Sequence, residues 1–189
     1  MAMPQTWPRQ GEWTVEEMWR LPETGERYEV IDGVLYVTPS PRYIHQDAVA
    51  ALHRHLHDYL VANRAGWARH APADVVFGPN DGVQPDLFVS SLVDGRRPAD
   101  WREITRLLLA VEVLSPSTAS RDRNVKRRLY QQHADEYWIV DLDARLIERW
   151  RPEDTRPEIL DATLTWAPTG ADASLTLDLE AFFREVLEG

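Results

Sequence analysis

The sequence predicts a mixed α/β fold, in which a central mixed β-sheet is flanked by helices and extended by an N-terminal β-hairpin and by C-terminal strands and a helix. Residues 107–114 and 136–141 have the continuous apolar character of buried strands. A helical stripe of apolar residues spans 42–63. No internal repeat or linker interrupts the chain, so we expect a single domain over 1–189, with a poorly ordered tail over 1–12.

The N-terminal part is expected to form a short helix and a hairpin. Thr14 is a cap residue ahead of two glutamates, and the helix that it starts should end at Pro22. Residues 27–32 and 34–38 are typical of short strands joined at Asp32–Gly33, because an Asp-Gly pair between apolar runs is a strong hairpin signal.

A long amphipathic helix and two strands should follow. In the helix over 42–63, spacings of three and four residues place one stripe toward the core, namely His45, Val49, Leu52, Leu56 and Tyr59. Residues 67–77 and 83–90 are expected to be strands on either side of a turn at 78–82. The polar stretch 91–103 should be a loop with a short helical turn.

The second half of the chain alternates strand and helix and ends in a helix. Residues 115–118 supply a stop and a helix cap after the strand at 107–114. The expected elements that follow are a helix over 119–133, a buried strand over 136–141, a half-exposed strand over 145–151, weak strands near Ile159 and Leu164, and a helix over 179–187.

The charged residues are acidic in balance and nearly all the basic ones are arginine. The net charge is −10, and of 21 basic residues 20 are arginine and one, Lys126, is lysine. This balance argues against a general nucleic-acid coat protein, since phosphate binding depends on Lys and Arg, but it does not exclude an enzyme that contacts nucleic acid locally. The arginine bias is expected of a GC-rich genome, which makes the single lysine conspicuous.

Composition also excludes several classes of protein. The absence of cysteine excludes disulfides, thiolate metal sites and cysteine nucleophiles. Residues 1–11 contain no apolar stretch, so no signal peptide is expected. The apolar run 107–114 has eight residues and contains Glu112, and it is too short to span a membrane. We therefore expect a cytoplasmic protein without a membrane partner.

Two carboxylates stand in apolar strands. Asp86 lies in the run 83–89, and Glu112 lies in the run 107–114. An ionised carboxylate in such a place is costly unless it is paired or binds a metal. Each is therefore a candidate metal ligand, although a salt bridge or a strand-end position explains either one alone equally well.

The helix after Glu112 carries the single lysine. One of its faces combines charged residues with residues that should be buried: Asp122, Val125, Lys126, Leu129 and His133. Lys126 is therefore expected to point toward the sheet. The alternative is a surface pair with Asp122, worth only about 0.3–0.5 kcal/mol. The other faces carry arginines that are solvated or that grip phosphates: Arg121, Arg123, Arg127 and Arg128.

These residues resemble a known family when they are taken together. The motifs are Tyr28-Glu29-Val-Ile-Asp32-Gly33, Pro41-Arg-Tyr-Ile-His45-Gln46, Gln84-Pro85-Asp86, Glu112-Val-Leu-Ser-Pro-Ser-Thr with Asp122, Lys126 and Tyr130, and Glu136-Tyr-Trp-Ile-Val-Asp141. From about Tyr28 to Trp150 the chain resembles the Uma2 family of the PD-(D/E)XK, or restriction-endonuclease-like, superfamily. Gln84-Pro85-Asp86 is similar to its "PD" element.

The resemblance implies a restriction-endonuclease-like core and a metal-dependent endonuclease that acts on DNA. Asp86 and Glu112 would bind Mg²⁺ or Mn²⁺, joined by the main-chain carbonyl of Val113. The usual lysine of the superfamily stands two residues after the glutamate, where this chain has Leu114, and the resemblance places it at Lys126 instead. A lysine there would stabilise developing charge or position the water, whereas arginine, with a pKa above about 12, is a poor proton carrier.

Other residues have a functional and a structural interpretation. Glu29 completes the acidic cluster or pairs with an arginine, and His45 orients water or phosphate or is a satisfied core histidine. Structural roles are favoured for Tyr130 in the core and for Ser115 and Ser117 as caps. Zinc binding by His53 and His57 is a minor hypothesis, and base stacking or an interface role is one for Trp101.

Two further functions stay open from the sequence. The first is a catalytically inactive nucleic-acid-binding or regulatory module, since a fold alone does not establish activity. The second is a metal-dependent hydrolase of another class that uses His45 with the carboxylates. A homodimer is one arrangement that lets a nuclease face two strands, with the 91–104 loop or the C-terminal segment as the interface.

Overall fold

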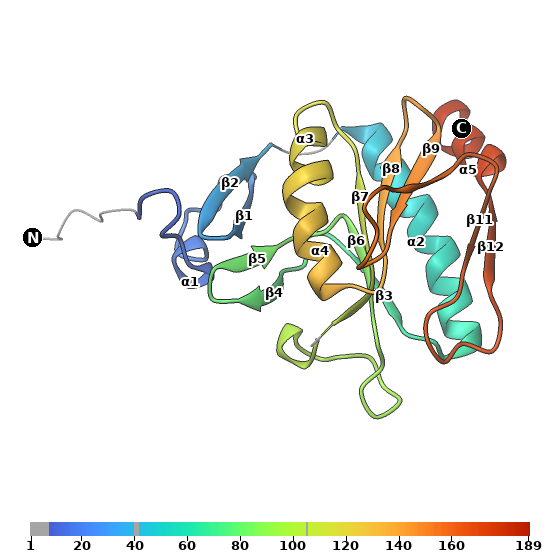
Figure 1. The fold of residues 1–189 in the computed structure, drawn as a ribbon, viewed down its shortest axis with the longest axis horizontal. Helices are drawn as coiled ribbons and strands as arrows, with labels where there is room; N and C mark the ends of the chain where they lie inside the picture. The colour runs from blue at the N-terminus through green and yellow to red at the C-terminus, as the bar shows by residue number, and fades with distance from the viewer. Residues whose placement is uncertain (1–7, 40–41, 105) are drawn as a thin grey trace, which may run out of the picture.

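The fold is built on a six-stranded mixed sheet (Figure 1). The computed structural model describes residues 8–39, 42–104 and 106–189. The strands in sheet order are β10 (Glu158–Leu160), β9 (Leu146–Trp150), β8 (Tyr137–Asp141), β7 (Leu107–Val113), β6 (Leu87–Ser90) and β3 (Trp67–His70). β7 and β8 are parallel and the other neighbours are antiparallel, so the predicted mixed sheet is confirmed.

A second, four-stranded sheet lies on the N-terminal side. Its order is β2 (Val34–Thr38), β1 (Arg27–Ile31), β5 (Asp81–Val83) and β4 (Val75–Gly78). The β1–β2 hairpin turns at Asp32 and Gly33, which both have positive φ, as a two-residue hairpin turn of this kind requires. The short helix α1 (Val15–Met18) begins with a capping box between Thr14 and Glu17.

Helices cover both faces of the central sheet (Figure 1). On one face lies α2, and outside it lie α5 and a two-stranded sheet of β11 and β12; on the other face α3, η2 and α4 form one helical rod. None of the helices in the described ranges is both long and apolar enough to cross a membrane. The bounds are α2 (Tyr43–Asn63), η1 (Trp101–Glu103), α3 (Ala119–Arg121), η2 (Asp122–Lys126), α4 (Arg127–His133), β11 (Thr163–Trp166), β12 (Leu175–Asp178) and α5 (Leu179–Glu188).

Alternate side chains of the central strands supply two apolar cores. Val111 and Val113 of β7 join the core beneath α2, whereas Ala110 joins the core beneath α4. Glu112 has the same parity as Ala110, so its carboxylate points toward the helical rod. The predicted buried stripe of α2 is confirmed from its first member, His45, onward.

Two single strands that the sequence predicts, 67–77 and 83–90, are each divided between the two sheets. Pro72 lies in the first break and Pro85 in the second, and proline has no N–H to donate to a sheet. Asp86 therefore lies in the bend where the chain crosses from the small sheet to the central sheet, and not within a strand.

The helix predicted over 119–133 is present, but it is not uniform. Its middle part, Asp122–Lys126, is a π-helix between α3 and α4. A π turn closes an i→i+5 hydrogen bond, so it changes the direction in which the residues after it leave the helix. Such turns occur frequently at functional sites.

The two ends of the chain depart from the prediction. β12 pairs with β11 at a place where the sequence predicts no strand. Of the predicted tail over 1–12, residues 1–7 lie outside the described part of the chain. Gln10 and Gly11, in contrast, hydrogen-bond to the β1–β2 hairpin, so the hairpin holds the second part of the expected tail.

The core between α2 and the central sheet should contribute much of the stability. Leu56 is fully buried there, and Leu56→Ala should lower the free energy of unfolding by about 2–5 kcal/mol because it leaves a cavity. Val61 lies on the same helix but is 51% exposed, so Val61→Ala should cost less than about 1 kcal/mol. Urea unfolding followed by circular dichroism measures both; equal losses would contradict this packing.

Candidate active site

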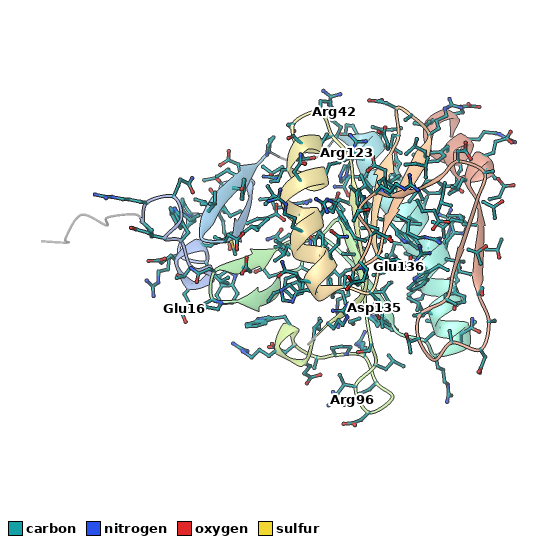
Figure 2. The ribbon with its side chains drawn as sticks, viewed as in Figure 1. Glu16, Arg42, Arg96, Arg123, Asp135 and Glu136 are labelled. Atoms are coloured by element: carbon teal, nitrogen blue, oxygen red, sulfur yellow. The ribbon has the colours of Figure 1, made fainter. Side chains whose placement is uncertain are left out.

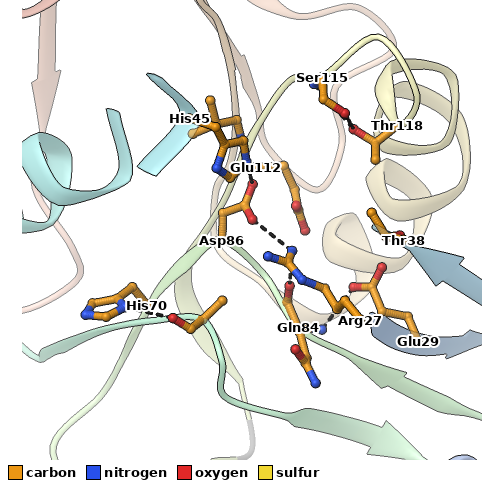
Figure 3. A network of polar contacts seen from close by, with 12 residues as sticks. Arg27, Glu29, Thr38, His45, His70, Gln84, Asp86, Glu112, Ser115 and Thr118 are labelled. Atoms are coloured by element: carbon orange, nitrogen blue, oxygen red, sulfur yellow. Dashed lines mark hydrogen bonds and ion pairs between the residues drawn. The ribbon is translucent and has the colours of Figure 1, made fainter. Parts of the chain in front are cut away.

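A pocket of about 550 Å³ opens between the N-terminus of α2, the end of β7 and the start of the helical rod. Arg42 and Arg123, which both line it, are labelled near the same end of the molecule in Figure 2. Figure 3 shows from close by how the polar side chains converge. The ionisable residues among those that line the pocket include Arg27, His45, Asp86, Glu112, Asp122 and Lys126.

Asp86 is held by contacts from three elements. Its Oδ1 accepts a hydrogen bond of 2.8 Å from Nη1 of Arg27 on β1, and its Oδ2 accepts one of 2.9 Å from the backbone amide of Val113 on β7. Nε2 of His45, on α2, lies 2.9 Å from the same Oδ2. The carboxylate is only 3% exposed, so its orientation is fixed (Figure 3).

Lys126 lies between two glutamates that belong to different sheets. Its Nζ is 2.8 Å from Oε1 of Glu112 on β7 and 2.8 Å from Oε1 of Glu29 on β1. The hydroxyl of Tyr130 donates to the same oxygen of Glu112 at 3.0 Å. The lysine is 1% exposed, so it points toward the sheet, as the helical spacing predicts, and is not part of a surface pair.

Glu29 is a fully buried member of the cluster. On β1 it alternates with Ile31, which packs in the core beneath α4, so both side chains face the helical rod. Its Oε1 also accepts the backbone N–H of Gln84 at 3.0 Å. Its Oε2 has no hydrogen-bond partner within the described ranges, and Nη2 of Arg121 lies 3.8 Å away. Glu29 therefore lies in the acidic cluster and pairs more closely with Lys126 than with an arginine, and its role toward a metal stays a prediction.

Asp122 is a fourth buried carboxylate, at the first position of the π-helix. It is 1% exposed, and its Oδ1 has no hydrogen-bond partner among the residues that the structure describes. The sequence places Asp122 on the face of Lys126 but predicts at most a surface pair. Asp122 is instead buried, and with Glu29, Asp86 and Glu112 it forms the acidic cluster.

The carboxylates of the pocket differ in their pKa. Burial by itself would raise the pKa of Asp86, but the hydrogen bond and the charge of His45, together with Arg27, hold it well below its usual range. Burial raises the pKa of Glu112 well above its usual value, and the neighbouring carboxylates add to the rise although Lys126 opposes it. Burial also raises the pKa of Asp122. Within one pocket, Asp86 is thus the strongly ionised group.

The ammonium of Lys126 is the fixed charge of the site. Burial alone would lower its pKa, but Glu112, Glu29 and Asp122 raise the pKa above the ordinary lysine value. Three neighbouring carboxylates favour the charged form of this one cation. Lys126 therefore keeps its proton at neutral pH.

The four arginines of the helical rod have different environments. Arg121 is not on a solvated face, because β2 covers this side of the rod and Nη2 of Arg121 donates to Oγ1 of Thr38 at 2.6 Å. Arg123 is paired with carboxylates of β8 and β9. Arg127 stacks on a tryptophan ring of β9, and Arg128 is exposed. Arg121 and Arg123 line the pocket, and the other two lie outside its lining.

The remaining candidates have structural contacts. Tyr130 is fully buried in the core, as expected, and also contacts Glu112. Oγ of Ser115 lies 3.1 Å from Oγ of Ser117 and 3.0 Å from Oγ1 of Thr118, at the start of the helical rod. The N-cap residue of α3 is Thr118, and no side chain makes a capping hydrogen bond there, so the predicted capping role of Ser115 and Ser117 is not observed. Trp101 packs against Trp19, with ring centroids 5.9 Å apart.

The histidine pair of α2 does not form a metal site in the described residues. His53 and His57 have ring centroids 5.7 Å apart, and His70 lies beside His53. Within 8–39, 42–104 and 106–189, however, no group of three or more His, Asp or Glu side chains is arranged to hold a metal ion. The zinc hypothesis therefore gains no support.

The pocket still offers oxygen ligands of the kind that Mg²⁺ and Mn²⁺ use. Asp86 and Glu112 both line it, and proteins commonly bind Mg²⁺ through one or two carboxylates while waters and substrate phosphates complete the coordination. Oδ1 of Asp122 has no hydrogen-bond partner among the described residues, so this buried carboxylate oxygen is available to a cation. The donor set therefore fits a divalent cation. The carbonyl of Val113 stays a predicted ligand.

Arg27 is the contact residue that the sequence interpretation missed. It bonds to Asp86 and lies in the wall of the pocket. The signal was available in β1, because Arg27, Glu29 and Ile31 alternate on one face of the strand. That Asp86 is its partner could not be read from the same pattern, since 59 positions separate the two residues.

The fold is shared with a solved structure. It is similar to the crystal structure of a "putative nuclease belonging to DUF820" from Anabaena variabilis ATCC 29413, with a TM-score of 0.76. The two sequences are 21% identical, and the similarity covers 92% of this chain and 99% of the other. A search of curated proteins finds no match.

The sequence also matches a known family. The family model "Uma2: Putative restriction endonuclease" matches residues 15–181. The chain therefore belongs to the Uma2 family, and the resemblance found in the sequence is confirmed. Membership of this family supports a nuclease function.

Removing the shared lysine should destabilise the protein strongly. Lys126→Met leaves Glu29 and Glu112 buried without their cation and should cost about 3–5 kcal/mol near neutral pH. Without the ammonium, the folded-state pKa of Glu112 lies still further above its unfolded value. The deficit is therefore largest above the folded-state pKa and shrinks as pH falls toward the unfolded one.

Urea unfolding at about pH 8 and about pH 5 measures this deficit. Arg184→Gln is the control, because it removes an exposed pair with Glu180 on α5 and should cost at most about 0.5 kcal/mol at either pH. A deficit for Lys126→Met that does not change with pH would show that unpaired carboxylates are not its cause.

Proposed function

We propose that this protein is a divalent-metal-dependent endonuclease that hydrolyses phosphodiester bonds in DNA. The observation that carries the proposal is the meeting of Asp86, Glu112 and Lys126 in one pocket, with Nζ of the lysine 2.8 Å from the glutamate. Membership of a family described as a restriction endonuclease supports nuclease activity and favours DNA as the substrate.

Asp86 and Glu112, with the carbonyl of Val113, would hold Mg²⁺ or Mn²⁺. The bound cation would supply Lewis-acid activation of water and neutralise charge on the phosphate. Contacts within the chain orient both carboxylates: His45 contacts Asp86, and Lys126 donates to Glu112. Such supporting contacts fix ligand geometry before the substrate arrives.

Lys126 would act as a fixed positive charge rather than as a base. Its carboxylate neighbours keep it protonated, so it is a poor acceptor for a proton from water. An ammonium beside Glu112 can instead stabilise negative charge that develops on the phosphate. The compact ammonium would fit between two buried carboxylates where a larger planar guanidinium would not, and this fit would explain why a lysine stands here in a chain that otherwise uses arginine.

The rim of the pocket suits a phosphate backbone. Arg42, Arg121 and Arg123 line it, so guanidinium groups that can contact phosphate are present there although the whole chain is acidic. Phosphate contacts of this kind position a nucleic acid without reading its sequence. We propose that these arginines hold the strand on either side of the scissile bond.

The carboxylates are tested by cleavage of supercoiled plasmid DNA with Mg²⁺ or Mn²⁺ and with EDTA. The wild type should cleave only with metal, and Asp86→Asn and Glu112→Gln should each lower the rate by roughly 100-fold or more, because loss of a mere supporting partner already costs about 10–100-fold. Glu180→Gln, an exposed change on α5, should cleave normally. Undiminished cleavage by Glu112→Gln would refute the proposal, and DNA binding without cleavage would favour a non-catalytic module.

The lysine is tested by a substitution that keeps its charge. Lys126→Arg should slow cleavage by about 10-fold or more, because the planar guanidinium is larger and cannot replace a buried point charge in the same geometry. Circular dichroism on the same sample establishes that the variant is folded. A folded variant that cleaves as fast as the wild type would show that the identity of the cation does not matter.

A further inference from the structure

Arg27 contacts the metal-site carboxylate that Lys126 does not contact. Its Nη1 donates to Oδ1 of Asp86 at 2.8 Å and to the carbonyl of Gln84 at 3.2 Å (Figure 3). The side chain is 16% exposed, so the pair is largely removed from water. Lys126 in turn is within ion-pair distance of Glu29 and Glu112. Arg27 thus pairs with Asp86, whereas Lys126 pairs with Glu29 and Glu112.

The contact of Arg27 is made on an atom that a metal ion would also need. Oδ2 of Asp86 already accepts from the amide of Val113 and lies against His45, which leaves Oδ1 as the oxygen held by a cation of the chain. A guanidinium and a divalent ion on one buried carboxylate would repel each other. Arginine cannot relieve this repulsion by losing its proton.

Arg27 also has a place to which it can move. It lines the candidate active site and, on its other side, a second pocket of about 630 Å³ between α1 and the β1–β2 hairpin. The acidic residues that line this second pocket are Glu23, Glu26 and Asp74. A guanidinium that leaves Asp86 would therefore meet carboxylates again, and its charge would not be left in apolar surroundings.

We propose that Arg27 is an internal counter-ion of Asp86 that the divalent cation displaces toward the second pocket, so that Arg27 sets the metal affinity of the site. This inference rests on the proposed function, because it requires a divalent ion at Asp86. Arg27 is a positioning residue in this scheme: it holds Asp86 in the metal-free protein and weakens metal binding by competition.

The first test compares Mn²⁺ binding to the wild type and to Arg27→Gln, measured on the full chain by the electron paramagnetic resonance signal of free Mn²⁺. The dissociation constant should fall by at least about 10-fold in the variant, or about 1.4 kcal/mol in binding free energy. In EDTA the variant should melt at a lower temperature than the wild type, because Asp86 has lost its counter-ion.

Arg149→Gln is the matched control. Arg149 on β9 is a buried arginine, 6% exposed, that pairs with Glu136 just before β8 and with Glu158 on β10. This variant should also melt at a lower temperature in EDTA, but its affinity for Mn²⁺ should equal that of the wild type. Tighter binding by both variants would overturn the inference, because general loosening would then explain it.

The second test uses the wild type and does not depend on a folded variant. A crystal structure with Mn²⁺ should show the guanidinium of Arg27 moved beyond hydrogen-bond distance from Asp86. Arg27 still bonded to Asp86 beside a bound Mn²⁺, or unchanged affinity in Arg27→Gln, would overturn the inference and leave the proposed function intact. If neither the wild type nor Arg27→Gln binds Mn²⁺, the proposed metal site itself is wrong.

Discussion

The ion pairs of Lys126 are the constraint on which the rest of the structure depends. The ammonium is buried between Glu29 of the small sheet and Glu112 of the central sheet, and the helical rod supplies it. A charge buried in this way is tolerable only with well-placed partners, since desolvation of each ion costs several kcal/mol. The three elements are therefore joined at one point by charge, while apolar cores join them elsewhere.

This polar centre explains the position of Asp86 in the chain. β5 belongs to the small sheet and β6 to the central sheet. The bend between them lies beside the ion pairs of Lys126, since the backbone N–H of Gln84 in this bend donates to Glu29. Pro85 prevents a continuous strand, and Asp86 then reaches contacts from β1, α2 and β7 at once. The division of the strand brings a carboxylate to the place where the sheets meet.

Sequence periodicity was sufficient to predict which faces of the regular elements are buried. The stripe of α2 and the inward direction of Lys126 both follow from spacing alone. The division of predicted strands did not follow, because alternation continues across a break and only the prolines mark it. The contact of Arg27 with Asp86 and the cover that β2 gives Arg121 depend on how distant segments pack, and no local pattern encodes that.

The π-helix makes the site sensitive to the number of residues in the rod. Successive residues of a helix point in different directions, so deleting a single position of the rod before Lys126 would send its side chain to another face unless the π turn closed into an α turn. Length changes in this segment are therefore far less tolerable than equal changes in the polar loop before β7. The ammonium reaches Glu112 from a neighbouring helix and not from the strand itself. Because the helical rod and not β7 carries the cation, other residues of β7 can change during evolution without loss of the cation.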